Sequence, residues 1–196
     1  MDFDDAVRFH GHVCPGLATG YRVAQIAEEE FKGRAEDEEL VAIVENKSCG
    51  IDAIQVVNGC TFGKGNLIFR DHGKHVYTFF RRGDNRAIRI SSRPRERSGT
   101  SESEKDELFE KVRSSSANED EMERFRERHH ERVRTVLETP ADQLFVVEHV
   151  QIAPPPKAMV YQSIPCTECG EEVMETRARL KHGQIVCLPC FEGHDI

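Results

Sequence analysis

Residues 67–90, LIFRDHGKHVYTFFRRGDNRAIRI, decide the fold class of this chain. Three apolar runs within it, Leu67–Phe69, Val76–Phe80 and Ala87–Ile90, are rich in the β-branched and aromatic residues that favour strands. The sequences DHGK and GDN between the runs are typical of hairpin turns. The stretch therefore predicts three consecutive strands of an antiparallel meander.

Helix and strand patterns surround this meander. The spacing of apolar residues predicts helices that begin near Asp5, at Pro15 and at Ile51, and proline suits the first position of a helix because its missing N–H has no partner to lose. Short apolar runs at Val41–Val44 and Leu144–Val147 predict two further strands. We therefore expect an α+β core in which helices pack on an antiparallel sheet.

A long and very charged helix is expected over Glu119–Glu138. Its less polar residues form one narrow seam, which consists of Met122, Phe125, His129, Val133, Val136 and Leu137. A charged helix with such a seam packs on a sheet or on its own copy in a second subunit. This helix is one reason to predict a homodimer.

A proline-rich run at residues 153–157, APPPK, divides the chain. Consecutive prolines favour extended polyproline geometry and make a semi-rigid spacer. We expect an α+β domain over residues 1–152, a linker over 153–162 and a small module over 163–196. A stiff linker would hold the module away from its own core domain, which favours packing against a second subunit.

The small module contains two C-x2-C knuckles. The four thiols are those of Cys166, Cys169, Cys187 and Cys190. Their spacing predicts a structural Cys₄ zinc site in a zinc-ribbon or treble-clef-like module, because a tight turn presents two sulfurs to one ion and zinc takes four tetrahedral ligands. The alternatives are four unrelated core cysteines or two disulfides. A site closed by four protein ligands would not be catalytic.

The charge balance weighs against nucleic acid as a partner. The chain has 35 acidic and 27 basic residues and a net charge of −8. The module beyond Ser163 itself has six acidic residues against three basic ones, whereas DNA affinity comes mainly from cations that displace phosphate counterions. No apolar run approaches the ~20 residues of a membrane helix. The acidic first residues do not resemble a signal peptide, so we expect a cytoplasmic protein with reduced or metal-bound cysteines.

A second group of potential ligands lies in FHGHVCPG, residues 9–16. His10, His12 and Cys14 supply imidazole and thiolate, which suit zinc, iron or copper. Cys14 stands where a helix N-cap is expected, and the helix terminus there would favour its thiolate. The alternative is that the histidines cap or pack locally and that Cys14 is a small buried residue.

The segment SCGID, residues 48–52, repeats this arrangement. Cys49 precedes the next predicted helix, and Cys60 follows the glycine that ends it. If the two helices converge at their N-termini, His12, Cys14 and Cys49 meet in an electropositive pocket. Such a pocket could hold a metal, an activated thiolate or an anionic group.

The glycine-rich segment NGCTFGKGN, residues 58–66, is a weaker candidate. It runs from a helix into a strand and lacks the frame of a phosphate-binding P-loop. Lys64 is nevertheless a candidate contact for an anionic ligand. A Ser/His/Asp site is not expected, because no nucleophile elbow is present and the His129–His130 pair and His149 are interpreted as surface or core residues.

The motifs FHGHVCPG, SCGIDAIQ and NGCTFGKGN, in this order, resemble the FmdE family of formylmethanofuran dehydrogenase proteins over most of the first 150 residues. The CTEC…CLPC module is similar to the zinc-finger extension of some members. The resemblance implies a dimerising α+β domain and association with the formylmethanofuran dehydrogenase complex of methanogenesis, whose redox chemistry belongs to other subunits. The implied metal or active-site positions are His10, His12, Cys14, Cys49 and Cys60.

Two functions follow. The first is a metal-binding accessory protein with a structural Zn²⁺ and a candidate second transition metal. The second is an enzyme in which Cys14 or Cys49 is a catalytic thiolate that acts on a small one-carbon or anionic substrate. A zinc-finger transcription factor is disfavoured by the charge. Metal content separates the first two, because an enzyme with only a free thiol would hold one zinc per chain.

Overall fold

The computed structural model of the protein describes residues 1–94 and 102–193. The chain forms two compact units, Met1–Lys157 and Ala158–Ile196, whose boundary falls inside the segment 153–162 that the prolines predict as a linker. Each unit is described by itself. Among the described residues, no helix combines the length and the apolar character that crossing a membrane requires.

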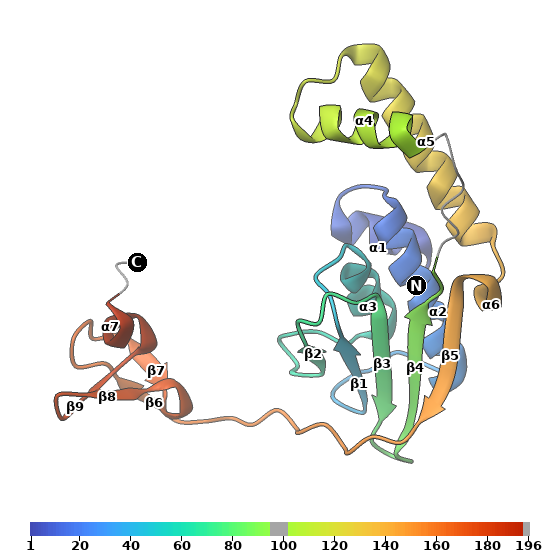
Figure 1. Cartoon of the computed structure of the whole chain (residues 1–196). Helices are drawn as coiled ribbons and strands as arrows, with labels where there is room; N and C mark the ends of the chain where they lie inside the picture. Colours follow the sequence, from blue (N-terminus) through green and yellow to red (C-terminus); the bar gives the residue numbers. More distant parts are fainter. Residues whose placement is uncertain (95–101, 194–196) are drawn as a thin grey trace. The chain divides into compact units, whose positions relative to one another are not determined.

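A five-stranded sheet forms the centre of the first unit (Figure 1). Its strands are β1 (Leu40–Val44), β2 (Leu67–Phe69), β3 (Val76–Arg81), β4 (Arg86–Ser92) and β5 (Phe145–Val150). They lie in the order β2-β1-β3-β4-β5. Only β1 and β2 are parallel, and the other neighbours are antiparallel. The predicted α+β class is confirmed.

The predicted meander is wrong at its first turn. β3 and β4 form the expected hairpin, in which Arg81 is paired with Arg86. β2, however, pairs with β1 and not with β3, so the DHGK sequence connects two strands that are not neighbours. All five residues of β1 are buried, and a strand that is apolar on both faces takes an interior position. The three-residue β2 is left at the edge.

Helices α2 and α3 pack on one face of this sheet and share one core with it. The helices of the first unit are α1 (Phe3–His10), α2 (Pro15–Phe31), α3 (Gly50–Asn58), α4 (Glu102–Arg113), α5 (Glu119–Glu138) and α6 (Ala141–Leu144). Within the core, Val23 and Phe31 of α2 and Ile54 of α3 meet Tyr77 and Phe79 of β3, all of them almost fully buried. The two helices therefore pack on the same face of the sheet.

Two glycines allow α2 and α3 to touch through their backbones. A Cβ atom on Gly20 would lie 2.1 Å from the carbonyl oxygen of Gly50. A Cβ atom on Gly50 would in turn lie 2.9 Å from the Cα of Gly20. Because no side chain lies between them, the second turn of α2 and the first residue of α3 are in backbone contact.

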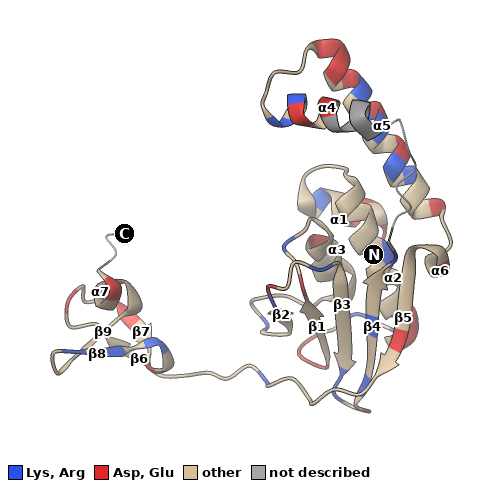
Figure 2. Cartoon of the chain, viewed as in Figure 1, with Lys and Arg blue, Asp and Glu red and all other residues tan. Residues whose placement is uncertain are grey.

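The charged helix α5 packs on α2 and not on the sheet. Its apolar residues Val133 and Val136 are buried against Ala18 of α2. Figure 2 shows that α4 and α5 carry dense acidic and basic residues. Asn118 and Glu121 form a capping box at the start of α5, which explains why this charged helix begins where it does.

The second unit is a small four-cysteine module. Its elements are β6 (Ser163–Pro165), β7 (Glu172–Met174), a 3₁₀ turn (Glu175–Arg177), β8 (Arg179–Lys181), β9 (Gln184–Val186) and α7 (Leu188–Glu192). The first knuckle joins β6 to β7, and the second lies at the N-terminus of α7. The ligand atoms of Cys166, Cys169, Cys187 and Cys190 all lie within 4.8 Å of one another.

The backbone of the module favours a thiolate at Cys166. The N–H of Cys187 donates to Cys166 Sγ at 3.3 Å. Hydrogen bonds from the backbone N–H groups of Cys169 and Cys187 lower the pKa of Cys166 to about 6. The apolar cluster around these sulfurs is small, with Val173 and Val186 as its only aliphatic members among the described residues. We therefore expect the stability of the module to depend on a bound metal.

We predict that Gly20→Ala lowers the free energy of unfolding by about 1–3 kcal/mol. The added methyl group would clash with the backbone of Gly50, and this clash destabilises the fold by more than the higher helix propensity of alanine stabilises it. Chemical denaturation measures the change. Gly83→Ala is the control, since a Cβ atom there meets nothing within 4 Å. If Gly20→Ala were as stable as the control, the close helix contact would be wrong.

We also predict that Cys187→Ser removes one equivalent of zinc per chain and unfolds the second unit, while the first unit remains folded. Elemental analysis and thermal melting of the full chain measure both effects. Thr167→Ser is the control, because it keeps the hydroxyl that donates to the Ile185 carbonyl at 2.9 Å. Unchanged zinc in Cys187→Ser would contradict the assignment.

Candidate metal centre

Four potential ligands meet where the first three helices converge. The ligand atoms of His10, His12, Cys14 and Cys49 all lie within 4.8 Å of one another. Cys14 is buried, His10 and Cys49 are partly buried, and His12 is exposed. The predicted meeting of His12, Cys14 and Cys49 is therefore present in the geometry, and His10 joins it.

Local structure explains the position of each ligand. His10 is the last residue of α1, and Gly11, with a φ of 93°, reverses the chain there. Cys14 is the N-cap of α2, where its Sγ accepts a hydrogen bond from the N–H of Leu17 at 3.3 Å. Cys49 is the N-cap residue of α3. Two helix starts and one helix end thus present the donor atoms.

Asp52 orients one of the imidazoles, a role that the sequence motifs did not indicate. His10 Nδ1 lies 2.7 Å from Asp52 Oδ2. With Nδ1 donating to the carboxylate, Nε2 is left as the acceptor, and it lies 3.9 Å from Cys14 Sγ. A carboxylate behind a histidine is the usual outer partner of a metal ligand. The one signal in the sequence is the position of Asp52 about one helical turn after Cys49.

The Cys49 thiol by itself is not an activated nucleophile. Burial, followed by the neighbouring Cys14 thiol, raises the pKa of Cys49 above its usual value. The expectation that a helix N-terminus makes this thiol acidic is therefore not met. Two adjacent thiols can both lose their protons when a cation lies between them.

Two further candidates lie elsewhere. Cys60 is fully buried, its Sγ donates to the Leu40 carbonyl at 3.5 Å, and burial raises its pKa to about 12. Lys64 donates from Nζ to the carbonyls of Ala35 and Glu36, at 2.9 and 3.4 Å. The structure therefore brings neither Cys60 nor the Lys64 ammonium to the cluster, and both stabilise the segment around β1.

One side of the cluster faces α5. A cavity of about 230 Å³ lies there, lined by His12, Val13, Cys14, Phe125, Arg126, His129 and His130. The ring centroids of Phe125 and His129 are 4.1 Å apart, and burial lowers the pKa of His129. The interpretation of His129 and His130 as ordinary surface or core residues missed this position. Helical spacing alone cannot show which element a helix covers.

Comparisons with known proteins agree with this architecture. Residues 9–146 match the family model described as FmdE, molybdenum formylmethanofuran dehydrogenase operon. Residues 160–195 match the model of the prokaryotic dksA/traR C4-type zinc finger. The second match supports zinc as the ion of the four-cysteine module.

A solved structure has the same fold. It is the crystal structure of a tungsten formylmethanofuran dehydrogenase FmdE-like protein from Syntrophus aciditrophicus. The TM-score is 0.63 at 20% identity, with 98% of this chain and 91% of the other covered.

A curated relative is the probable S-adenosyl-L-methionine-binding protein of Archaeoglobus fulgidus. It is 36% identical over 192 residues, which cover 94% of this chain. The chain spans about half the length of that relative, 51%. The family match covers the cluster, α2, α3, strands β1 to β4 and the start of β5, and it shows that the chain belongs to the FmdE family.

Proposed function

We propose that the protein is a metal-binding accessory protein of the FmdE type. Its core domain holds a transition metal at His10, His12, Cys14 and Cys49, and its C-terminal module holds a structural zinc. The observation that carries the proposal is the convergence of these four core ligand atoms within 4.8 Å. Three of the residues come from three different helix ends and His12 from the segment between α1 and α2, so their meeting is a property of the tertiary fold.

The donor set fits a tetrahedral ion. Bonds of about 2.0–2.3 Å place tetrahedral ligand atoms roughly 3.3–3.8 Å apart, so small side-chain movements suffice to close the site. Two imidazoles and two thiolates suit ions of borderline softness, the class to which Zn²⁺ and Fe²⁺ belong. Such an ion supplies Lewis acidity and keeps both thiols deprotonated.

The burial of the ligands differs in a way that favours exchange. Asp52 and the two helix starts hold His10, Cys14 and Cys49, whereas His12 is exposed and follows the αL residue Gly11. His12 is therefore the ligand that an incoming molecule or a partner protein could displace. This arrangement supports a role in holding or transferring a metal.

We further propose that the accessory role concerns a formylmethanofuran dehydrogenase complex. The support is the description of the family model, which names the molybdenum formylmethanofuran dehydrogenase operon. The described part of the chain holds no cysteine cluster beyond the two already given, so the redox steps are assigned to other subunits.

We predict that Asp52→Ala weakens metal binding at the core site about 10–100-fold, because His10 loses the carboxylate that fixes its tautomer. Competition with a chromophoric chelator measures the affinity. Glu45→Ala is the matched control, since Glu45 Oε2 lies 3.0 Å from His72 Nδ1 in a similar pair that is not part of the cluster.

Cys49→Ala should remove the core metal and leave the zinc module loaded. Equal affinity in Asp52→Ala and Glu45→Ala would refute the role of Asp52, and unchanged metal content in Cys49→Ala would refute the site.

We also propose that the protein functions as a homodimer. The α4–α5 hairpin supports this, because Phe109 of α4 is exposed at 53% beside a long charged helix. Multi-angle light scattering should give twice the chain mass of 22.3 kDa. A species with the mass of one chain at micromolar concentration would argue against the dimer.

A further inference from the structure

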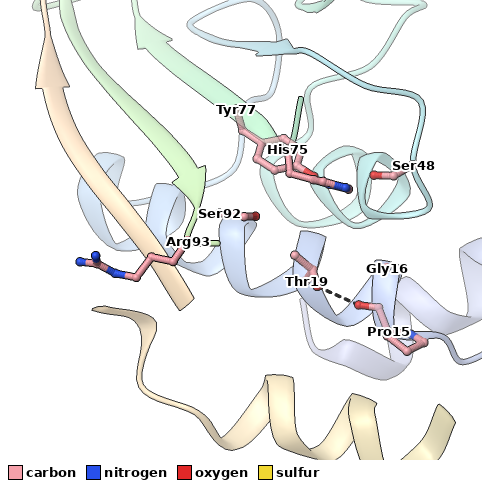
Figure 3. Close-up of a pocket in the computed structure, with 8 residues that line it drawn as sticks. All are labelled: Pro15, Gly16, Thr19, Ser48, His75, Tyr77, Ser92 and Arg93. Carbon is pink, nitrogen blue, oxygen red and sulfur yellow. Dashed lines mark hydrogen bonds between the residues drawn. The ribbon is translucent and has the colours of Figure 1, made fainter. Parts of the chain in front are cut away.

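A cavity lies beside the chain neighbours of Cys14 and Cys49. It has a volume of about 380 Å³, within the range of small-ligand sites. It is lined by Pro15, Gly16, Thr19, Ser48, His75, Tyr77, Ser92 and Arg93 (Figure 3). These residues come from the start of α2, the start of α3 and the adjacent ends of β3 and β4, all of them in the first unit.

Gly16 connects this cavity to the thiols. A Cβ atom on Gly16 would lie 3.8 Å from Cys49 Sγ and 3.9 Å from Cys14 Sγ. Two other lining residues, Pro15 and Ser48, are the chain neighbours of those cysteines. Gly16 therefore borders both the cavity and the two thiols, although neither cysteine lines the cavity.

Three polar side chains in the cavity wall have unused hydrogen-bonding capacity. In the described part of the chain, no hydrogen bond involves Ser48 Oγ, Ser92 Oγ or the ring of His75. Figure 3 shows the His75 ring beside the Ser48 hydroxyl, with the Ser92 hydroxyl facing the same space. By contrast, Thr19 Oγ1 already donates to the Pro15 carbonyl at 2.9 Å.

The residues that line the cavity indicate the charge of its ligand. None of the lining residues is acidic, although the chain has 35 acidic residues. Arg93 stands at one end, where its Nε donates to the Asp142 carbonyl at 2.8 Å and its guanidinium points away from the other lining residues. At the other end the first turn of α2 offers the backbone N–H of Gly16, because Pro15 has no N–H and those of Leu17 and Ala18 are donated to Cys14. A cavity wall that offers hydrogen-bond donors and no carboxylate suits a ligand rich in hydrogen-bond acceptors.

We propose that this cavity binds a small oxygen anion, a carboxylate or an inorganic oxyanion, beside the metal held by His10, His12, Cys14 and Cys49. The proposal deepens the proposed function and rests on it for the position of the metal. Ser48, Ser92 and His75 donate hydrogen bonds to the anion, and Gly16 is the lining residue that adjoins the two thiols of the metal site.

The test uses the metal-loaded full chain labelled with ¹⁵N. Sodium formate and inorganic phosphate are titrated separately, and the Gly16 amide and the His75 ring are followed by NMR. We expect saturable shifts at both positions with at least one anion. Saturation by formate alone identifies a carboxylate site, and saturation by phosphate alone identifies a site for tetrahedral oxyanions.

Substitutions of residues that line the cavity test where the anion binds. His75→Ala and Ser48→Ala should each weaken it about three- to tenfold, the effect of one hydrogen bond. His72→Ala is the control, because His72 lies three residues away and is paired with Glu45 on the surface. Binding equal in His75→Ala, Ser48→Ala and His72→Ala, or no saturable shift with either anion, would overturn the proposal.

The metal content of the same samples is also measured, which distinguishes a failure of the anion site from a failure of the metal centre. A chain that holds the second metal but binds neither anion refutes the cavity assignment and leaves the metal centre intact. A chain that binds an anion without holding a second metal refutes the metal centre and supports the cavity as an anion site.

Discussion

The backbone contact between Gly20 and Gly50 is the constraint on which the rest of the site depends. It lets α2 and α3 approach more closely than any pair of larger residues would allow. Because each helix begins with a cysteine at its N-cap, the close approach also brings Cys14 and Cys49 together. The pairing of the two thiols is thus a consequence of helix packing, and the sheet beneath both helices fixes their directions.

The remaining donors are added by local chain geometry. The end of α1 and the αL residue Gly11 place two imidazoles beside the thiols, and the rings of His10 and His12 lie 4.4 Å apart. Asp52, in the first turn of α3, then fixes the tautomer of His10. His12 and Cys14 line one cavity beside α5, and Gly16, which adjoins both thiols, lines a second cavity. A site with a cavity beside it suits a metal that must contact another molecule.

Much of this could be predicted from the sequence, and the failures have physical reasons. The knuckles at Cys166 and Cys187 and the helices that begin at Pro15 and Glu119 are local patterns, so spacing and capping revealed them. The place of β2 was missed because register between strands depends on long-range pairing, which a run of three apolar residues cannot specify. The role of Asp52 and the position of His129 were missed because both depend on which helices meet. Cys60 was included through its motif, and only the structure shows that its thiol lies in the core beside Leu40.

X-ray absorption spectroscopy of the metal-loaded full chain tests the central claim most directly. For the chain loaded with zinc alone, the account predicts two metals per chain that share two imidazole nitrogens and six sulfurs, which averages to one nitrogen and three sulfurs around each zinc. One metal per chain with four sulfurs and no nitrogen would contradict it, because the core cluster would then hold no ion.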